Sequence, residues 1–315
     1  MKKVAVVGSG FIGRAWAIVF ARGGQEVHLW DREEGAGGAA VGFIQDVLGD
    51  LERNDLLNGN APDDILARLH VQDDLAAALS GAVHIQENTP EVLDIKRTVL
   101  AELDRMADGQ AVIASSTSAL LPSALAEGMK GRHRIVVAHP INPPYLVPAV
   151  EVVPSPWTSE DVLERTRAFL AECGQSPIVM RKEHDGFIMN RMQGALLEEA
   201  FRLVAEGYAS IEDVDIGIRE GLALRWSFMG PFETIDLNAP GGVADYAARY
   251  QGIYERIHPQ MHHRVDWTGE VMQTVEADRR KALPEGELEE RQKWRDRRLM
   301  ALAAHKRQAD EALGK

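Results

Sequence analysis

Residues 2–20 read KKVAVVGSGFIGRAWAIVF, where a short apolar run is followed by a glycine cluster and then by apolar residues at helical spacing. The apolar run predicts a buried parallel strand over Val4–Val7, and the spacing from Ile12 to Phe20 predicts a helix with one apolar face. A strand, a tight glycine turn and a helix in this order begin the doubly wound α/β folds. We therefore expect the chain to open with such a fold.

The glycines of this turn have the spacing G-x-G-x-x-G, at Gly8, Gly10 and Gly13. The first permits the tight turn, the second lets the backbone approach a pyrophosphate, and the third lets helix and strand pack closely. The next predicted strand, EVHLWD, ends in Asp31, whose carboxylate suits a ribose diol and repels a 2′-phosphate. NAD is therefore the expected cofactor. Arg32 argues mildly for a 2′-phosphate, and thus for NADP. The alternative for the glycine cluster is a tight turn that binds no ligand.

Short apolar runs and helical patterns alternate through the rest of the first half. The predicted strands are residues 70–72, 83–86, 111–115 and 134–139, and the clearest helix is residues 90–107. Near residue 186 begins a helix that is apolar on more than one face, as a helix buried between layers or subunits is. The prediction is an α/β fold with a Rossmann-type doubly wound sheet in residues 1–186, followed by an all-helical domain in residues 187–315 that forms a homodimer.

The composition narrows the class of function. A net charge of -13 over 315 residues, without a basic cluster, argues against a nucleic-acid partner. The single cysteine, Cys173, and the lack of a long apolar run predict a cytoplasmic protein without disulfides or membrane spans. No group of His, Cys and Asp residues has the spacing of metal ligands, so we expect no metal.

Polar residues end several predicted strands, where ligands bind in such sheets. His139 ends the strand at residues 134–139, and Glu151 interrupts the apolar run PAVEVVP. A buried carboxylate needs a partner, and the proline-rich turn between the two residues can bring their strands side by side. Glu151 would then hold Nδ1 of His139 and leave Nε2 as a general base. The alternative is a structural His–Glu pair that locks the proline-rich loop.

Five further stretches follow the glycine turn in order along the chain: ENTPEVLDIK (87–96), SSTSALLPS (115–123), AHPINPPY (138–145), VEVVP (150–154) and DGFIMNR (185–191). Together with the glycine turn, they resemble the L-3-hydroxyacyl-CoA dehydrogenase family. The stretches VVPSPWTS (152–159), EEAFRLVAEG (198–207) and GPFETIDLNA (230–239) resemble, in more detail, its lambda-crystallin or L-gulonate 3-dehydrogenase branch. Single motifs of this kind are modestly specific, whereas six in order are strongly so.

The resemblance implies a set of site residues. The family's catalytic histidine and glutamate match His139 and Glu151, and its substrate-contacting serine and asparagine match Ser118 and Asn190. Its cofactor contacts match Phe11 and Ile12 through their backbone, together with Asp31, Glu91, Lys96 and Ser116.

The implied reaction is oxidation of the 3-hydroxyl group of a small free L-3-hydroxy acid, with NAD as the hydride acceptor. Arg225 enters the otherwise apolar segment GLALRWSFMGPFET, and we expect it either to bind the free carboxylate of this substrate or to form a salt bridge to a nearby acid. Two other functions stay open. One is a 3-hydroxyacyl-CoA or L-carnitine dehydrogenase with the same histidine and glutamate, and the other is an NAD-binding structural protein of the crystallin kind.

Overall fold

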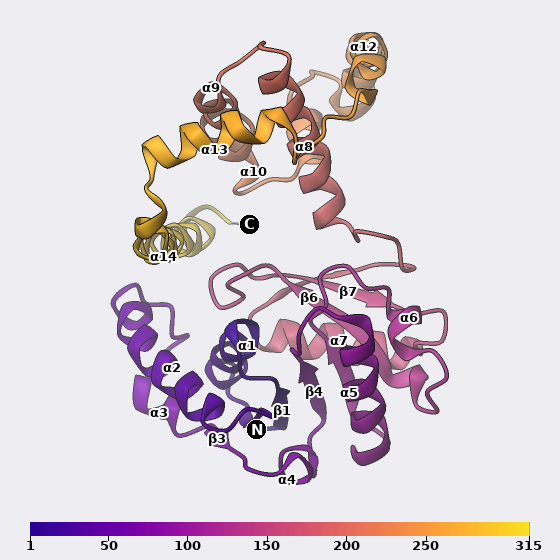
Figure 1. Cartoon of the computed structure of the whole chain (residues 1–315), viewed down its shortest axis with the longest axis vertical. Coiled ribbons are helices and arrows are strands. Elements are labelled where there is room, and N and C mark those ends of the chain that lie inside the picture. Colours follow the sequence, from indigo (N-terminus) through magenta and orange to yellow (C-terminus); the bar gives the residue numbers. More distant parts are fainter. Residues whose placement is uncertain (315) are drawn as a thin grey trace. The chain divides into compact units, whose positions relative to one another are not determined.

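The computed structural model describes residues 1–314 and contains an eight-stranded sheet in the order β3-β2-β1-β4-β5-β6-β7-β8 (Figure 1). The strands are β1 (Lys3–Val7), β2 (Glu26–Trp30), β3 (Leu69–Val71), β4 (His84–Glu87), β5 (Val112–Ser115), β6 (Ile135–Pro140), β7 (Ala149–Pro154) and β8 (Ser176–Val179). Neighbouring strands are parallel except β6 and β7. The order of the first six strands is that of a dinucleotide-binding doubly wound fold, as predicted.

Helices cover both faces of this sheet, because each buried strand turns alternate side chains to opposite sides. Val4 and Val6 pack in one apolar cluster, and Ala5 and Val7 in the other. The first cluster includes residues of α1 (Phe11–Arg22), α2 (Ala36–Arg53), α3 (Pro62–Leu66) and α7 (Glu160–Glu172). The second includes residues of α4 (Leu75–Leu79), α5 (Leu93–Met106) and α6 (Pro122–Ala126).

Local sequence explains where several of these helices begin. Pro62 occupies the first turn of α3, where its missing N–H group costs nothing. Asp74 caps α4 by accepting the backbone N–H groups of Ala76 and Ala77, and Ser159 caps α7. The sequence patterns did not predict β8, a short strand that contains a proline and is only partly buried.

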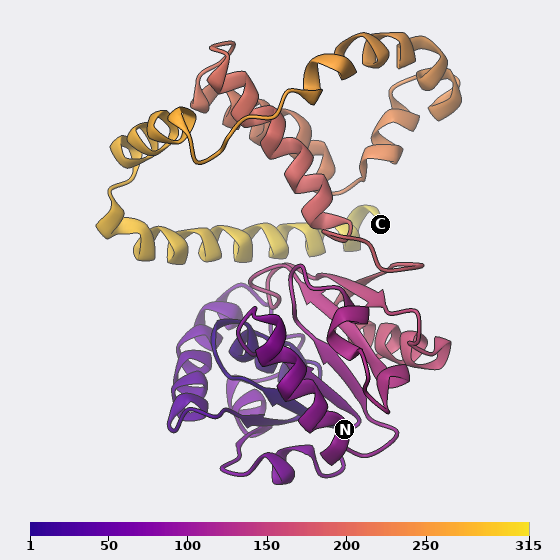
Figure 2. The same ribbon diagram turned by 45° about the vertical axis from the view of Figure 1, so that its right-hand side comes forward.

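The second part of the chain is all-helical, as predicted (Figure 2). Its helices are α8 (Met189–Ala205), α9 (Ile211–Ile216), α10 (Ala223–Trp226), α11 (Pro231–Leu237), α12 (Gly242–Ile257), α13 (Glu270–Ala282) and α14 (Leu288–Leu313), with a π-helical turn at Gly217–Leu222. Ser210 caps α9 by accepting the N–H group of Asp213, the arrangement that its sequence indicates.

Contacts divide the chain into two compact units. The first unit contains Met1–Met189 and the C-terminal segment from Trp294, and the second contains Asn190–Lys293. The proposed boundary after residue 186 lies near the first of these divisions. The segment from Trp294 groups with the sheet instead of the helices, because Met300 is buried in the first apolar cluster and Arg307 hydrogen-bonds to Asp55.

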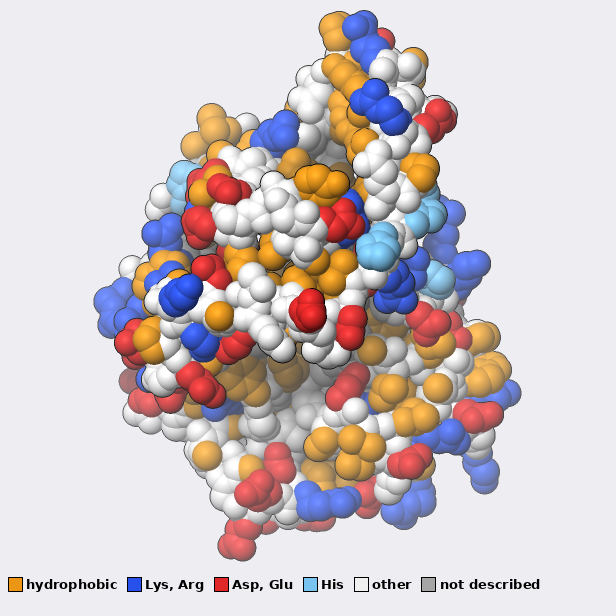
Figure 3. All heavy atoms as spheres, turned by 45° about the horizontal axis from the view of Figure 1, so that its top comes forward, with side chains coloured by type: hydrophobic (Ala, Val, Ile, Leu, Met, Phe, Trp, Pro, Cys, Tyr) orange, Lys and Arg blue, Asp and Glu red, His pale blue; other side chains and the backbone are white. Residues whose placement is uncertain are grey.

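Many large apolar side chains of the second unit are exposed (Figure 3). Phe228 is 71% exposed, Phe232 is 80% exposed and Leu237 is 69% exposed. Residues of α8 whose apolar pattern predicts burial, such as Met192 and Leu196, are exposed as well. An apolar surface of this kind usually contacts another protein surface. No helix within residues 1–314 has the length and apolar character needed to cross a membrane.

Candidate active site

The glycine turn between β1 and α1 has the geometry of a phosphate-binding turn. Gly8 adopts a left-handed backbone conformation with a φ of 86°. A Cβ atom on Gly13 would lie 1.8 Å from the carbonyl oxygen of Gly8, whereas a Cβ on Gly10 would meet no protein atom within 4 Å. No side chain caps α1, so the N–H groups of its first turn remain available to an anion. The turn therefore fits the pyrophosphate of NAD.

Asp31 follows the C-terminal end of β2, beside this turn. Its Oδ2 accepts the N–H of Ser9 at 2.6 Å and the hydroxyl of Ser9 at 3.0 Å, and its Oδ1 accepts the N–H of Glu33 at 3.0 Å. A carboxylate has about four acceptor positions. One position on Oδ1 is therefore left for a ribose hydroxyl, and these contacts hold the carboxylate in place for it.

His139 and Glu151 lie directly opposite each other on the antiparallel strands β6 and β7. Nδ1 of His139 is 2.8 Å from Oε2 of Glu151. The imidazole is 5% exposed and the carboxylate is fully buried. Because Glu151 accepts a hydrogen bond, Nδ1 carries the proton and Nε2 is left as the basic nitrogen.

The second oxygen of Glu151 is held by the start of α8. Oε1 accepts the backbone N–H groups of Ile188 at 2.6 Å and Met189 at 2.8 Å. Gly186 and Phe187, with φ values of 73° and 50°, turn the chain to present these donors. A left-handed phenylalanine costs about 1–3 kcal/mol, so the surrounding contacts must maintain this turn.

These contacts govern the ionisation of Glu151. Burial by itself would raise the pKa of its carboxyl group. The hydrogen bonds from His139, Met189 and Ile188 outweigh burial and hold the pKa below its usual value. The carboxylate is therefore charged at neutral pH and can stabilise a protonated imidazole.

Ser116 follows β5, and its hydroxyl group is already saturated. It accepts Nε1 of Trp16 at 3.0 Å and Nε2 of Gln86 at 2.8 Å, and it donates to Oδ1 of Asn88 at 2.7 Å. A hydroxyl has one donor and two acceptor positions. A contact between Ser116 and the nicotinamide would therefore have to use the backbone, and the side chain serves the packing beneath the site.

Glu91 lies in the loop after β4, Ser118 lies in the loop after β5, and Lys96 lies on α5; side-chain contacts bring these three residues together. Lys96 is 1% exposed, and its Nζ lies 3.1 Å from both carboxylate oxygens of the buried Glu87. Oε1 of Glu91 accepts the backbone N–H of Ser118 at 2.8 Å. The ammonium group that was predicted to contact the cofactor is thus paired inside the protein.

Asn142 is a candidate that the sequence patterns did not single out. Its Oδ1 atom is buried and has no hydrogen-bond donor within residues 1–314. Buried polar atoms without partners are rare, and a ligand is one explanation for them. In the sequence, the one sign of such a role is that Asn142 carries an amide side chain three residues after His139, within the proline-rich turn.

Asn190 and Arg225 belong to the second unit, whereas the other predicted site residues belong to the first. Asn190 is the second residue of α8 and is half-buried. Arg225 is half-buried in α10. A hydrogen bond to Tyr254 raises the pKa of Tyr246, and the charge of Arg225 opposes this shift. No acid within residues 1–314 forms a salt bridge with Arg225. The salt bridge that was the alternative prediction for this residue is therefore not formed within the described chain.

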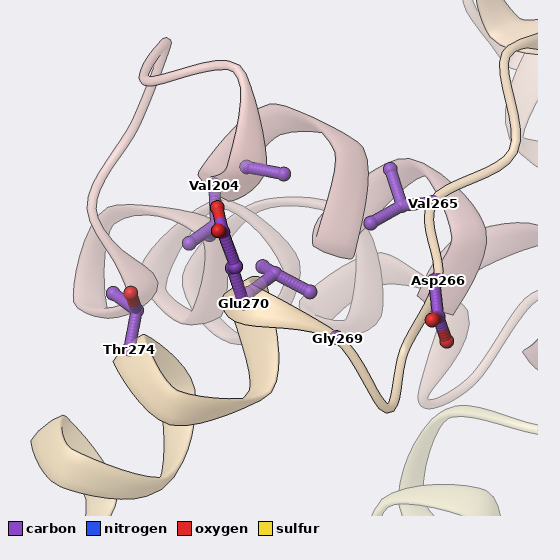
Figure 4. A pocket seen from close by; sticks show the side chains of 8 residues that line it. Val204, Val265, Asp266, Gly269, Glu270 and Thr274 are labelled. Carbon is purple, nitrogen blue, oxygen red and sulfur yellow. The ribbon is translucent and has the colours of Figure 1, made fainter.

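The second unit contains a hollow of about 500 Å³ (Figure 4). It is lined by Val204, Ala205, Val265, Asp266, Gly269, Glu270, Val271 and Thr274. It contains none of the predicted site residues, and its only charged side chains are the acids Asp266 and Glu270. We assign no ligand to it. Within residues 1–314, no three His, Cys, Asp or Glu residues are grouped as metal ligands.

Two family models match the chain. The NAD-binding domain of 3-hydroxyacyl-CoA dehydrogenase matches residues 3–184, and the C-terminal domain of the same family matches residues 186–279. Lambda-crystallin of Oryctolagus cuniculus is 41% identical, over 97% of this chain and 96% of its own length. L-carnitine dehydrogenase of Oceanobacillus iheyensis is 39% identical, over 75% of this chain and 76% of its own.

A solved structure shares most of the fold. It is the 5-dehydrogenase of 5-formyl-3-hydroxy-2-methylpyridine 4-carboxylic acid, an NAD+-dependent dismutase. The TM-score is 0.82 at 25% identity, and the match covers 96% of this chain and 97% of that one.

Proposed function

The chain belongs to the 3-hydroxyacyl-CoA dehydrogenase family of NAD-dependent oxidoreductases, and we propose that it oxidises the 3-hydroxyl group of a small free L-3-hydroxy acid, as an L-gulonate 3-dehydrogenase does. The observation that carries this proposal is the contact between His139 and Glu151. A buried carboxylate that fixes the imidazole tautomer is the arrangement that a general base for an alcohol needs.

The residues then have separate roles. Nε2 of His139 takes the hydroxyl proton of the substrate, and Glu151 stabilises the imidazolium that results. Ser118 and Asn190 donate hydrogen bonds to the substrate oxygen, where negative charge develops as the carbonyl forms. The turn at Gly8–Gly13 and Asp31 hold NAD, which supplies the hydride acceptor when bound. Proton transfer of this kind contributes about 10²–10⁴-fold to the rate.

One observation favours a free acid over a CoA thioester. Arg225 is a half-buried cation without a salt bridge to any acid in the described chain, and such a cation suits a carboxylate ligand. The similar dehydrogenases of L-carnitine and of a pyridine carboxylic acid are named for substrates with a free carboxylate.

A substrate panel tests the proposal. NADH formation is measured with L-gulonate, L-3-hydroxybutyrate, L-carnitine and L-3-hydroxybutyryl-CoA, with NAD or NADP as the oxidant. We expect the highest kcat/KM with one of the free acids and NAD. A preference for the thioester would support the acyl-CoA alternative, and no turnover of any compound despite NAD binding would support a structural protein.

The proposed role of Arg225 has a matched control. Arg225→Met should raise KM for the best free acid by about 10- to 100-fold, because charge-assisted hydrogen bonds to the carboxylate are lost. Arg219→Met removes a nearby cation that is exposed and paired with Glu220, so it should change KM less than twofold. Equal KM values for the two variants would contradict the role of Arg225.

We also propose that the chain forms a homodimer through the second unit. The exposed Phe228, Phe232 and Leu237 support this proposal, since a monomer rarely leaves so many large apolar side chains in water. Light scattering after size exclusion should give a mass near twice 34.7 kDa. Phe232→Glu should shift the protein toward the monomer, and a wild-type monomer would contradict the proposal.

A further inference from the structure

Two opposite charges are fully buried where β4 ends. Glu87 is 0% exposed and Lys96, on α5, is 1% exposed. Nζ of Lys96 contacts both oxygens of Glu87 at 3.1 Å and donates to the carbonyl of Thr89 at 3.0 Å. Glu87 also accepts the hydroxyl of Ser115 at 2.5 Å and the N–H of Thr89 at 2.6 Å. A buried pair with this many hydrogen bonds is rigid.

Lys96 links this buried group to the surface of the site. Its Nζ is 3.6 Å from Oε2 of Glu91, whose side chain is 43% exposed. One ammonium group therefore faces two carboxylates, one fully buried and one at the surface. Because Glu87 fixes the position of Lys96, Lys96 in turn restrains the carboxylate of Glu91.

The other oxygen of Glu91 holds the loop that follows β5. Oε1 accepts the hydroxyl of Thr117 at 2.5 Å, the N–H of Ser118 at 2.8 Å and the N–H of Ala119 at 3.2 Å. Three donors from consecutive residues thus converge on one carboxylate oxygen. This is how a carboxylate orders a loop that would otherwise expose its backbone donors to water.

We propose that Glu91 and Lys96 are positioning residues for Ser118: the buried Glu87–Lys96 pair fixes Glu91, and Glu91 fixes the backbone of the serine that orients the substrate oxygen. This inference rests on the substrate role of Ser118 in the proposed function. It differs from the role that the family resemblance implies for Glu91 and Lys96, which is direct contact with the cofactor. Direct contact with the cofactor would affect the dissociation constant for NAD, whereas positioning of Ser118 would affect kcat.

Glu91 is the residue to change, because removal of Lys96 leaves Glu87 buried without its cation and endangers the fold. Glu91→Ala should lower kcat by about 10- to 100-fold, since the Ser118 loop loses its acceptor. The dissociation constant for NAD, from calorimetry, should change less than threefold. Glu91→Gln keeps a neutral acceptor and should recover part of kcat. Glu127→Gln, an exposed glutamate paired with Arg97, is the control and should change neither constant.

A double-mutant cycle with Ser118→Ala separates this inference from the proposed function. The best free acid of the panel is used, and the melting temperature of each variant verifies folding. If Glu91 acts through Ser118, Glu91→Ala should cost less than threefold in kcat once Ser118 is already alanine. An undiminished cost in that background, or a weakened NAD affinity with kcat unchanged, would overturn the positioning role. If Ser118→Ala alone leaves kcat intact, the proposed function of Ser118 fails, and the inference fails with it.

Discussion

Replacement of Lys96 by methionine tests how much stability the sheet domain loses when Glu87 stays buried without its cation. Methionine matches the length of the lysine stem, so the substitution removes the charge with little change in packing. It takes away the contacts of Nζ with Glu87 and with the carbonyl of Thr89. The carboxylate of Glu87 then stays fully buried without a counter-charge.

The expected loss follows from these contacts. Removal of one partner of a buried pair costs about 3–5 kcal/mol, because the remaining charge is not compensated. Glu87 keeps its hydrogen bonds from Ser115 and Thr89, which places the cost near the lower end. About 3 kcal/mol lowers the melting temperature of a unit of about 200 residues by roughly 6–12 °C.

Arg97→Met is the matched control, since Arg97 is the next residue of α5 and pairs with Glu127 at the surface. Exposed pairs contribute about 0–1 kcal/mol, so its melting temperature should fall by roughly 4 °C at most. Both variants are measured by scanning calorimetry on the full chain. Equal melting temperatures for the two would refute the conclusion that burial makes the Lys96 pair costly to break.

Two further outcomes follow from the site. Gly10→Ala should leave the melting temperature unchanged, because the added Cβ meets no protein atom within 4 Å. It should weaken NAD binding at least about tenfold, because the Cβ blocks the pyrophosphate. An unaltered NAD affinity in calorimetry would contradict the assignment of this turn to the pyrophosphate. Glu151→Gln should reduce the loss of stability in acid. The pKa of Glu151 in the folded protein lies below its usual value of 4.5. The carboxylate therefore contributes to folding stability above pH 4.5, and this contribution is lost as the pH falls through the folded-state pKa. An equal fall in melting temperature between pH 7 and pH 3 for the wild type and the variant would rule this out.

Local sequence patterns predicted the strands and helices of the first unit whose buried faces depend on nearby residues. The period of the apolar residues and the glycine turn suffice for β1, α1 and the alternation that follows, because each unit buries its own apolar face. The proline-rich turn between His139 and Glu151 also pointed to their neighbouring strands. The register that places the two residues opposite each other then brings Nδ1 and the carboxylate together.

Features that depend on distant neighbours could not be predicted in the same way. Lys96 contacts Glu87, at the end of β4, and the carbonyl of Thr89, so its burial follows from the sheet and not from its own helix. The highly charged pattern of α14 gave no sign that Met300 is buried against the sheet domain. Asn142 stands out only once its buried oxygen is found without a donor.

The central claim is that His139, oriented by Glu151, is the base that removes the hydroxyl proton. The most direct test is kcat and the NAD dissociation constant of His139→Ala, with the best free acid of the panel. The account predicts that kcat falls by about 10²–10⁴-fold while NAD binds as tightly as to the wild type. A variant that keeps kcat within threefold of the wild type would contradict it.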